Sequence, residues 1–171
     1  MGSSDSLEPF RAAHAREVAG WAATAEEARR WGGQAAVWPV AASVFSAWHA
    51  DPDVWPFVLV RSGVLLGYGE VWIDTEEREV ELGRIIVRPE HRGQGLGRLL
   101  VTLLLEQAAK TGYRAAFVRV TPNNAAALAC YRRAGFAPVG EEERLAFNKG
   151  QPLAYVWLRC VLVARSRGDV A

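Results

Sequence analysis

The chain is poor in cysteine. Cys130 and Cys160 are the only two among 171 residues, and the sequence has no CxxC pair, no HExxH motif and no histidine at ligand spacing. A disulfide scaffold and a protein zinc site are therefore both disfavoured, and no metal is expected. So few cysteines are typical of a reducing compartment, and we expect a cytoplasmic protein.

Long apolar runs and an excess of one charge are also missing. No 18 consecutive residues are apolar, and the start, MGSSDS, lacks the basic and apolar regions of a signal peptide, so neither a membrane span nor export is expected. Twenty Lys and Arg oppose nineteen Asp and Glu, which leaves a net charge of +1. A chain this close to neutral has no electrostatic footprint for nucleic acid or a membrane surface, which favours a small-molecule or protein partner.

What is present is typical of one globular domain. Half of the residues are hydrophobic and 23% are charged, an average mixture for a chain of ordinary domain size. We expect residues 1–171 to form a single domain with flexible ends at about residues 1–6 and 165–171. Five of the seven tryptophans lie between Trp21 and Trp55, where they form either core or the wall of a pocket.

The hydrophobic pattern is helical in the first third of the chain. After an alternating apolar stretch at Leu7–Arg11, three helices are expected. They cover Ala12–Trp21, the segment from a capping box at Thr24 and Glu27 to Gly32-Gly33, and a segment with Pro39 in its first turn that carries Phe45 and Trp48.

The period then changes to that of strands. An antiparallel meander is expected from Val54–Arg61, Val64–Asp74 and Arg78–Val87. A glycine-rich loop follows, and after it a helix at Leu96–Lys110, a strand at Ala115–Val120, a helix at Asn124–Ala134, and strands around Phe136–Phe147 and Leu153–Val163. This order predicts an α+β fold whose mixed sheet contains one βαβ crossover.

The glycine-rich loop between Val87 and Arg98 is the most informative segment. Glycines there let the backbone approach a ligand, and the first N–H groups of the following helix form an anion site, so the loop is interpreted as a pyrophosphate cradle. The spacing Gly93-x-Gly95-x-Gly97 differs from the GxGxxG of dinucleotide folds, and no Gly-Lys-Ser/Thr follows as in a P-loop.

Two motifs make the sequence resemble the GNAT superfamily of acyl-CoA-dependent N-acyltransferases. The segment Arg92-Gly93-Gln94-Gly95-Leu96-Gly97 matches the family pattern Arg/Gln-x-x-Gly-x-Gly/Ala. A second pattern, Asn-x-x-Ala-x-x-x-Tyr followed by Gly-Phe, is matched by Asn124, Ala127, Tyr131 and Gly135-Phe136. The resemblance covers about residues 54–140. It implies a mostly antiparallel sheet of about six or seven strands flanked by helices, with two splayed strands that form a V-shaped cofactor cleft.

The resemblance also implies acetyl-CoA as the acyl donor. Its pantetheine arm would hydrogen-bond the backbone of Ile85, Ile86 and Val87. Asn124 would contact the same arm, and Tyr131 would place its hydroxyl near the thioester sulfur. The diphosphate would take the backbone N–H groups of the loop, at Arg92, Gly93, Gln94, Gly95, Leu96, Gly97 and Arg98.

Acetyl transfer to an amine needs a proton acceptor and a proton donor. An alkyl ammonium has a pKa near ~10 and must lose a proton before attack, whereas the leaving thiolate gains from a donor. Tyr131 is the candidate general acid. Glu81, eleven residues before Arg92, matches the catalytic glutamate of the family's histone-acetylating branch and is the candidate base. Glu79 on the same strand face is the alternative, and either glutamate could act through water or simply be solvated.

Two neighbouring residues remain open at this stage. Glu70 could oppose one of these glutamates across the hairpin, but a shift of one residue would turn it to the other face. Arg119 stands where the branch that acetylates ribosomal-protein N-termini has a glutamate, which counts against that branch's base and substrate. Arg119 could bind an acceptor carboxylate or pair with Glu79 or Glu81.

The sequence thus predicts an acetyl-CoA-dependent N-acetyltransferase. It would act on a primary amine of a small molecule, peptide or protein by direct attack in a ternary complex. The alternatives are a non-catalytic acyl-CoA-binding or interaction module, and a transferase with another acyl donor or an oxygen acceptor. The partners would be acetyl-CoA, an unidentified amine and, through exposed edge strands, a second copy in a homodimer. One or two of the five early tryptophans are expected to line the amine pocket.

Overall fold

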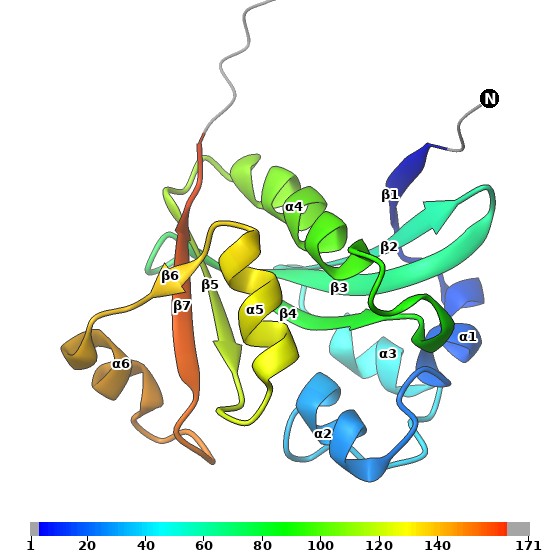
Figure 1. Ribbon diagram of the computed structural model, residues 1–171, viewed down its shortest axis with the longest axis horizontal. Coiled ribbons are helices and arrows are strands. Elements are labelled where there is room, and N and C mark those ends of the chain that lie inside the picture. The colour runs from blue at the N-terminus through cyan, green and yellow to red at the C-terminus, as the bar shows by residue number, and fades with distance from the viewer. Residues whose placement is uncertain (1–3, 164–171) are drawn as a thin grey trace, which may run out of the picture.

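The computed structural model describes residues 4–163 and is built on an open seven-stranded sheet (Figure 1). The strand order is β1-β2-β3-β4-β5-β7-β6, and every neighbouring pair is antiparallel except β4 and β5. The strands are β1 (Asp5–Pro9), β2 (Val54–Arg61), β3 (Val64–Asp74), β4 (Glu79–Val87), β5 (Ala115–Val120), β6 (Ala137–Pro138) and β7 (Val156–Val161). The predicted α+β fold with a mostly antiparallel sheet is confirmed.

Helices cover both faces of this sheet (Figure 1). The α-helices are α1 (Ala15–Ala19), α2 (Ala25–Gly32), α3 (Val44–Trp48), α4 (Leu96–Ala109), α5 (Ala125–Arg133) and α6 (Glu141–Asn148), with 3-10 turns at Ala12–His14 and Pro89–His91. Helices α4 and α5 pack on one face, and α1 to α3 cover the other face of β2 to β4. Helix α6 lies on this second face beside β7, where Phe147 packs on Phe117 and Trp157.

The core divides along the two faces because side chains alternate along each strand. In β4, Val80 and Leu82 pack with fully buried Leu100 and Leu104 of α4. Ile86 points instead to the cluster beneath α1 to α3. Since α4 follows the glycine loop directly, its burial against β3 and β4 fixes the loop at the carboxyl end of β4.

Strands β4 and β5 pair only at one end. Their parallel pairing joins Val80 with Ala116 and Glu81 with Phe117, and goes no further. Beyond it, β4 contains a bulge at Arg84, whose φ of +45° is rare for a residue other than glycine. The strands diverge past this bulge, so the predicted V-shaped cleft is present.

The strand predicted around Phe136–Phe147 is wrong. Strand β6 has only two residues, and α6 occupies most of the rest. The first turn of α6 is Glu141-Glu142-Glu143, and these carboxylates are stabilised by the positive end of the helix dipole. Arg144 also forms an ion pair with Glu141 at 2.6 Å. These local electrostatic interactions favour a helix and outweigh the apolar residues that suggested a strand.

Smaller differences affect the helices and the ends. The helix predicted with Pro39 in its first turn begins only at Val44, and the first predicted helix divides into a 3-10 turn and α1. Residues 1–3 and 164–171 lie outside the described residues. Asp5 and Ser6, which were expected in the flexible start, belong to β1, and Asp5 binds Arg61 through both carboxylate oxygens at 2.6 and 2.9 Å.

A close approach between strands makes Gly83 sensitive to substitution. A Cβ at Gly83 would overlap the indole ring of Trp72, whereas a Cβ at Gly140 would meet nothing within 4 Å. We expect Gly83→Ala to lower the free energy of unfolding by about 1–3 kcal/mol through overpacking. Gly140→Ala serves as the matched control, and denaturant unfolding of both variants measures the difference. Equal stability of the two variants would contradict this packing.

Candidate active site

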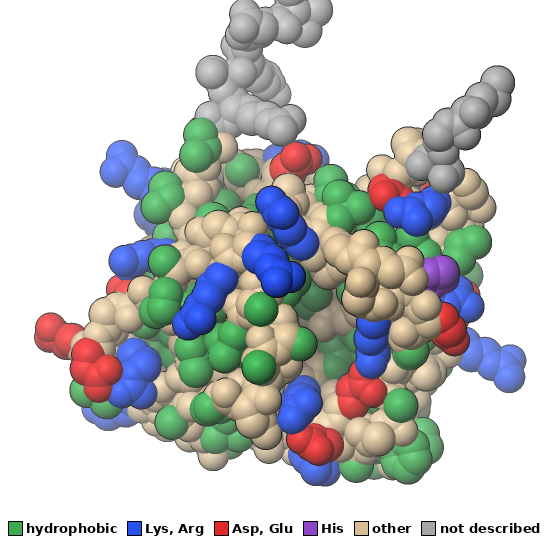
Figure 2. Space-filling model, viewed as in Figure 1, with side chains coloured by type: hydrophobic (Ala, Val, Ile, Leu, Met, Phe, Trp, Pro, Cys, Tyr) green, Lys and Arg blue, Asp and Glu red, His purple; other side chains and the backbone are tan. Residues whose placement is uncertain are grey.

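A groove of about 830 Å³ lies between the carboxyl end of β4, the glycine loop, α2 and α5. In the space-filling view a hollow opens between α5 and α2, and basic side chains lie over α4 and α5 beside it (Figure 2). The groove gathers ten of the twelve residues predicted to bind the cofactor: Ile85, Ile86, Val87, Arg92, Gly93, Gly95, Gly97, Arg98, Asn124 and Tyr131. The side chains of Gln94 and Leu96 do not line it, and Leu96 is packed in the core.

The start of α4 offers free backbone donors to this groove. The first hydrogen bond of the helix runs from Leu99 N–H to the carbonyl oxygen of Gly95 at 3.1 Å. Within the described part of the chain, the N–H groups of Leu96, Gly97 and Arg98 have no acceptor. Gly95 has a φ of +81°, a conformation that glycine adopts without strain. Free N–H groups at a helix start form an anion site.

Two arginines add positive charge to the same groove. Arg98 in the first turn of α4 and Arg133 at the end of α5 line it, and neither has a hydrogen-bond or ion-pair partner among residues 4–163. Arg92 is different, because its guanidinium donates to the carbonyl oxygen of Val87 at 3.0 Å and lies 2.5 Å from a carboxylate oxygen of Glu27. Arg92 therefore fastens the loop to β4 and to α2.

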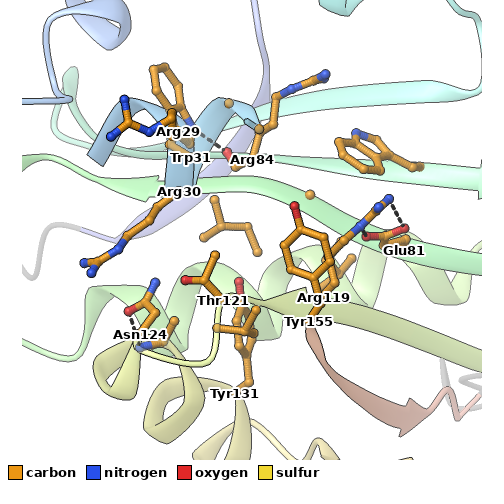
Figure 3. A pocket seen from close by; sticks show the side chains of 18 residues that line it. Arg29, Arg30, Trp31, Glu81, Arg84, Arg119, Thr121, Asn124, Tyr131 and Tyr155 are labelled. Carbon is orange, nitrogen blue, oxygen red and sulfur yellow. Dashed lines mark hydrogen bonds and ion pairs between the residues drawn. The ribbon is translucent and has the colours of Figure 1, made fainter. Parts of the chain in front are cut away.

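A second cavity, of about 270 Å³, adjoins the groove (Figure 3). In the close view, the hydroxyl groups of Tyr131 and Tyr155 point into it. The groove and the cavity share six lining residues, namely Arg30, Trp31, Ile85, Asn124, Ala127 and Tyr131. The two spaces therefore meet at Tyr131.

Tyr131 has the protonation state that a general acid needs. Burial raises the pKa of its hydroxyl well above the usual tyrosine value, and the nearby Cys130 and Glu81 raise it further. The hydroxyl thus keeps its proton at neutral pH and can donate it. Its ring packs edge-on against Phe136 with centroids 5.7 Å apart, so the Gly-Phe pair that ends the second motif helps to hold the tyrosine in place.

Glu81 and Arg119 form a bidentate ion pair at the edge of this cavity. The guanidinium donates to the two carboxylate oxygens at 2.5 and 3.0 Å, and its third nitrogen donates to Gln151 at 3.0 Å. Burial raises the pKa of the Glu81 carboxyl, and the hydrogen bonds and charge of Arg119 oppose that rise. Of the pairings considered for Arg119, the structure shows the one with Glu81.

Glu79 lies two residues earlier on the same face of β4 but faces another space. It lines a separate hollow with Asp74, Glu76 and Glu77, away from Tyr131. Burial raises the pKa of the Glu79 carboxyl, and the charges of Glu77, Asp74 and Glu143 raise it further. Glu81, in contrast, lines both this hollow and the cavity that contains Tyr131.

Sequence reasoning missed the buried network around Glu70. Its carboxylate has no exposed surface and accepts hydrogen bonds from Tyr68, from Trp72 Nε1 at 2.5 Å and from Arg84 at 2.8 Å. His49 lies 2.8 Å from the Tyr68 hydroxyl. The register pairs Glu70 with Gly83 and Trp72 with Glu81, so Glu70 shares the face of the two glutamates without standing opposite either. Alternation along β3 could have placed Tyr68, Glu70 and Trp72 on one face, but nothing local indicates the other partners.

One of the five early tryptophans lines the cavity. Trp31 does so, and its indole N–H donates to the carbonyl oxygen of Arg84 at 2.8 Å. Trp31 is thus the one of the five that lines this cavity, and its part in an amine pocket stays a prediction. Trp38 is neither core nor cavity wall, since it is 46% exposed. The others belong to or pack against the core clusters: Trp21, Trp48 and Trp55.

Within residues 4–163, no three His, Cys, Asp or Glu side chains are grouped so that they could hold a metal ion. In the same range, none of the helices combines the length and the apolar character needed to cross a bilayer.

Comparison with known proteins identifies the family. The model of the acetyltransferase (GNAT) family matches residues 15–136, and the chain belongs to this family. It is 36% identical over 91 residues to an IAA acetyltransferase of Azospirillum brasilense, which covers 53% of this chain and 60% of that protein. It is 32% identical over 114 residues to a streptothricin acetyltransferase of Streptomyces lavendulae, at 64% of this chain and 60% of that protein. The chain thus spans about 60% of the length of each of these relatives.

The fold is also that of a solved acetyltransferase. The aminoglycoside acetyltransferase AAC(6')-Ib, in complex with ribostamycin and coenzyme A, superposes with a TM-score of 0.74 and 20% identity. The alignment covers 98% of this chain and 99% of that one. At this identity the match establishes the shared fold, including a sheet flanked by helices.

The balance at Glu81 gives a prediction about pH. In Arg119→Gln the opposing interaction is lost, so the pKa of Glu81 should rise further. The folded state then holds this proton more tightly than the unfolded state does, and stability falls as pH rises from the usual glutamate value through the raised one. Urea unfolding at several pH values measures the slope. The double variant Arg119→Gln/Glu81→Gln should lose the extra slope, and an unchanged slope would refute the assignment.

Proposed function

We propose that this chain transfers the acetyl group of acetyl-CoA to a primary amine by direct attack in a ternary complex. The observation that carries the proposal is the meeting of the groove and the cavity at Tyr131. A thioester laid along the groove would end where an amine in the cavity could reach it. The family and the coenzyme A complex of a structural neighbour support the choice of cofactor.

The groove suits each part of the cofactor. The divergence of β4 from β5 leaves the backbone of Ile85, Ile86 and Val87 beside the groove, where an extended amide-bearing arm can add as another strand would. The Val87 carbonyl already accepts from Arg92, so the arm would use the other backbone groups. The free N–H groups at the start of α4 would bind the diphosphate, and Arg98 and Arg133 supply the countercharge.

The chemistry then needs two proton transfers. The amine nitrogen attacks the acetyl carbonyl carbon, the carbon–sulfur bond breaks, and the thiolate takes the Tyr131 proton. Tyr131 suits this role because it lies where the groove and the cavity meet, which is where the thioester sulfur would lie. Glu81 is the proposed base, acting through water, because a carboxylate oxygen bound once by Arg119 keeps a second lone pair. Glu79 does not line the cavity and is the weaker alternative.

The setting of this reaction follows from two further features. Cys130 and Cys160 are both free thiols, which suits the reducing conditions of the cytoplasm. Strands β1 and β6 are the outer strands of the sheet, and pairing of two copies along one of them would give the expected homodimer.

Removal of the Tyr131 hydroxyl tests the acid. We expect Tyr131→Phe to lower kcat by about 10²–10⁴-fold, the usual contribution of a general acid, with the dissociation constant for acetyl-CoA unchanged. Thiol release from acetyl-CoA with a panel of amines measures kcat, and calorimetry measures binding. Tyr113→Phe, the same change outside both the groove and the cavity, is the control. A wild-type rate in Tyr131→Phe would reject the role.

A matched pair of glycine variants tests the anion site. Gly95 and Gly112 have φ values of +81° and +74°, and a Cβ at either would meet nothing within 4 Å. Glutamate at either position therefore imposes similar backbone strain, but only Gly95→Glu places a negative charge beside the proposed diphosphate site. We expect Gly95→Glu to weaken coenzyme A binding at least about a hundredfold through like-charge repulsion, and Gly112→Glu to bind normally. Equal affinities, measured by calorimetry, would remove the loop from the cofactor site.

A further inference from the structure

Two tyrosine hydroxyl groups point into the cavity of about 270 Å³ from different elements (Figure 3). Tyr131 belongs to α5, and Tyr155 belongs to the segment that leads directly into β7. Neither hydroxyl has a hydrogen-bond partner among residues 4–163, and neither is among the fully enclosed polar atoms of that range. Both are therefore accessible from the cavity and can form hydrogen bonds with a ligand.

The two tyrosines lie on different sides of the site. Tyr131 lines the cavity and also the groove proposed for the cofactor. Tyr155 lines the cavity alone. Its hydroxyl is therefore on the side from which an amine would approach the thioester.

An amine in this cavity needs a group that accepts a hydrogen bond from its N–H. Among the side chains that line the cavity but not the groove, the arginines and the tryptophan can only donate. The Thr121 oxygen is fully enclosed. Both oxygens of Glu81 are bound by Arg119, which is why Glu81 is proposed to act through water. Among these side chains, the Tyr155 hydroxyl is the accessible acceptor that has no other partner.

The position of Tyr155 is fixed by contacts that leave its hydroxyl unused. Asn148, the last residue of α6, accepts from the Tyr155 N–H at 3.1 Å and donates to the Tyr155 carbonyl oxygen at 2.9 Å. The same side chain accepts from Trp157 Nε1 at 2.9 Å and so ties the segment to β7. The Arg119 guanidinium lies 5.8 Å from the centroid of the Tyr155 ring. The ring is thus held in place before any ligand binds, which lowers the entropic cost of binding one.

We propose, on the basis of the acetyl transfer proposed above, that Tyr155 binds the acceptor and that its hydroxyl oxygen accepts a hydrogen bond from the attacking amine. This bond uses an N–H of the amine, so the lone pair of the deprotonated nitrogen stays free to attack the acetyl carbonyl carbon. The two tyrosines then have different tasks. Tyr155 holds the amine, and Tyr131 protonates the leaving thiolate.

Removal of the Tyr155 hydroxyl tests the inference, because Tyr155→Phe keeps the ring. Thiol release from acetyl-CoA is measured with phenethylamine, spermidine and ribostamycin, and the amine that the wild type acetylates fastest is used. We expect KM for this amine to rise about tenfold, which corresponds to about 1.4 kcal/mol and is a usual size for one hydrogen bond. The bond is present before and during the attack, so kcat should change little. The dissociation constant for acetyl-CoA should stay the same, since Tyr155 does not line the groove.

Tyr113→Phe is the matched control, because Tyr113 lines neither the cavity nor the groove. It should leave kcat and KM at the wild-type values. The melting temperature of Tyr155→Phe should also equal that of the wild type, because its hydroxyl has no partner in the free protein. A wild-type KM for the amine in Tyr155→Phe would overturn the inference. A fall in kcat without a rise in KM would overturn it too, since the hydroxyl would then act in the chemical step.

Binding separates the two proposals if none of the three amines is acetylated. Calorimetry then measures their affinities for the coenzyme A complexes of the wild type and of Tyr155→Phe. Weaker binding of an amine to the variant would support the amine site while the proposed transfer fails. Equal affinities, or no binding of any of the three, would overturn the amine site as well.

A double-mutant cycle tests Asn148 as the positioning residue of Tyr155. Asn148→Asp keeps the oxygen that accepts two hydrogen bonds but removes the donor to the Tyr155 carbonyl. We expect this change to raise KM for the amine severalfold in the wild-type background and to have little effect in Tyr155→Phe. The new carboxylate charge is present in both backgrounds and cancels in the cycle. Equal effects in the two backgrounds would show that Asn148 does not act through the Tyr155 hydroxyl.

Discussion

The buried ion pair between Glu70 and Arg84 is the interaction on which the geometry of both spaces depends. Arg84 occupies a strained backbone conformation at the bulge of β4. Its guanidinium forms an ion pair with Glu70 and lies 4.3 Å from the ring centroid of Trp48. Its carbonyl oxygen, turned out of the strand ladder, accepts from the Trp31 indole. These contacts offset the strain of a positive φ, and the bulge they maintain separates β4 from β5. Without that separation there would be neither a groove for an extended arm nor a cavity beside it.

Burial of Glu70 also affects the balance of charge around the cavity. Beside the cavity, two acidic side chains are paired with arginines on neighbouring strands, Glu70 with Arg84 and Glu81 with Arg119. Each pair is nearly neutral as a unit, and the rings of Trp31, Trp72, Tyr131 and Tyr155 line the cavity beside them.

Much of this architecture was accessible from the sequence because local signals and motif spacing agreed. The glycine loop, Asn124 and Tyr131 were predicted together and lie along one groove. The strand predicted around residues 136–147 is wrong because three glutamates in the first turn and the Glu141–Arg144 pair favour a helix there. The Glu70 network could not be predicted, since it depends on a register shift in the β3–β4 hairpin and on a histidine from a distant helix end. Cavities arise from such long-range contacts. The hydrophobic periodicity of the sequence, which is two residues in strands and 3.6 in helices, does not reveal them.

The contacts of Arg92 have a consequence for how the two substrates influence each other. The guanidinium holds the glycine loop against Val87 of β4, Trp21 and Glu27 of α2. Helix α2 also carries Trp31, which forms a wall of the cavity beside Tyr131. The loop that would receive the diphosphate and the helix that shapes the acceptor space are therefore one mechanical unit. Removal of the Arg92 guanidinium would therefore take away the contacts that join the loop to β4 and to the helix that carries Trp31.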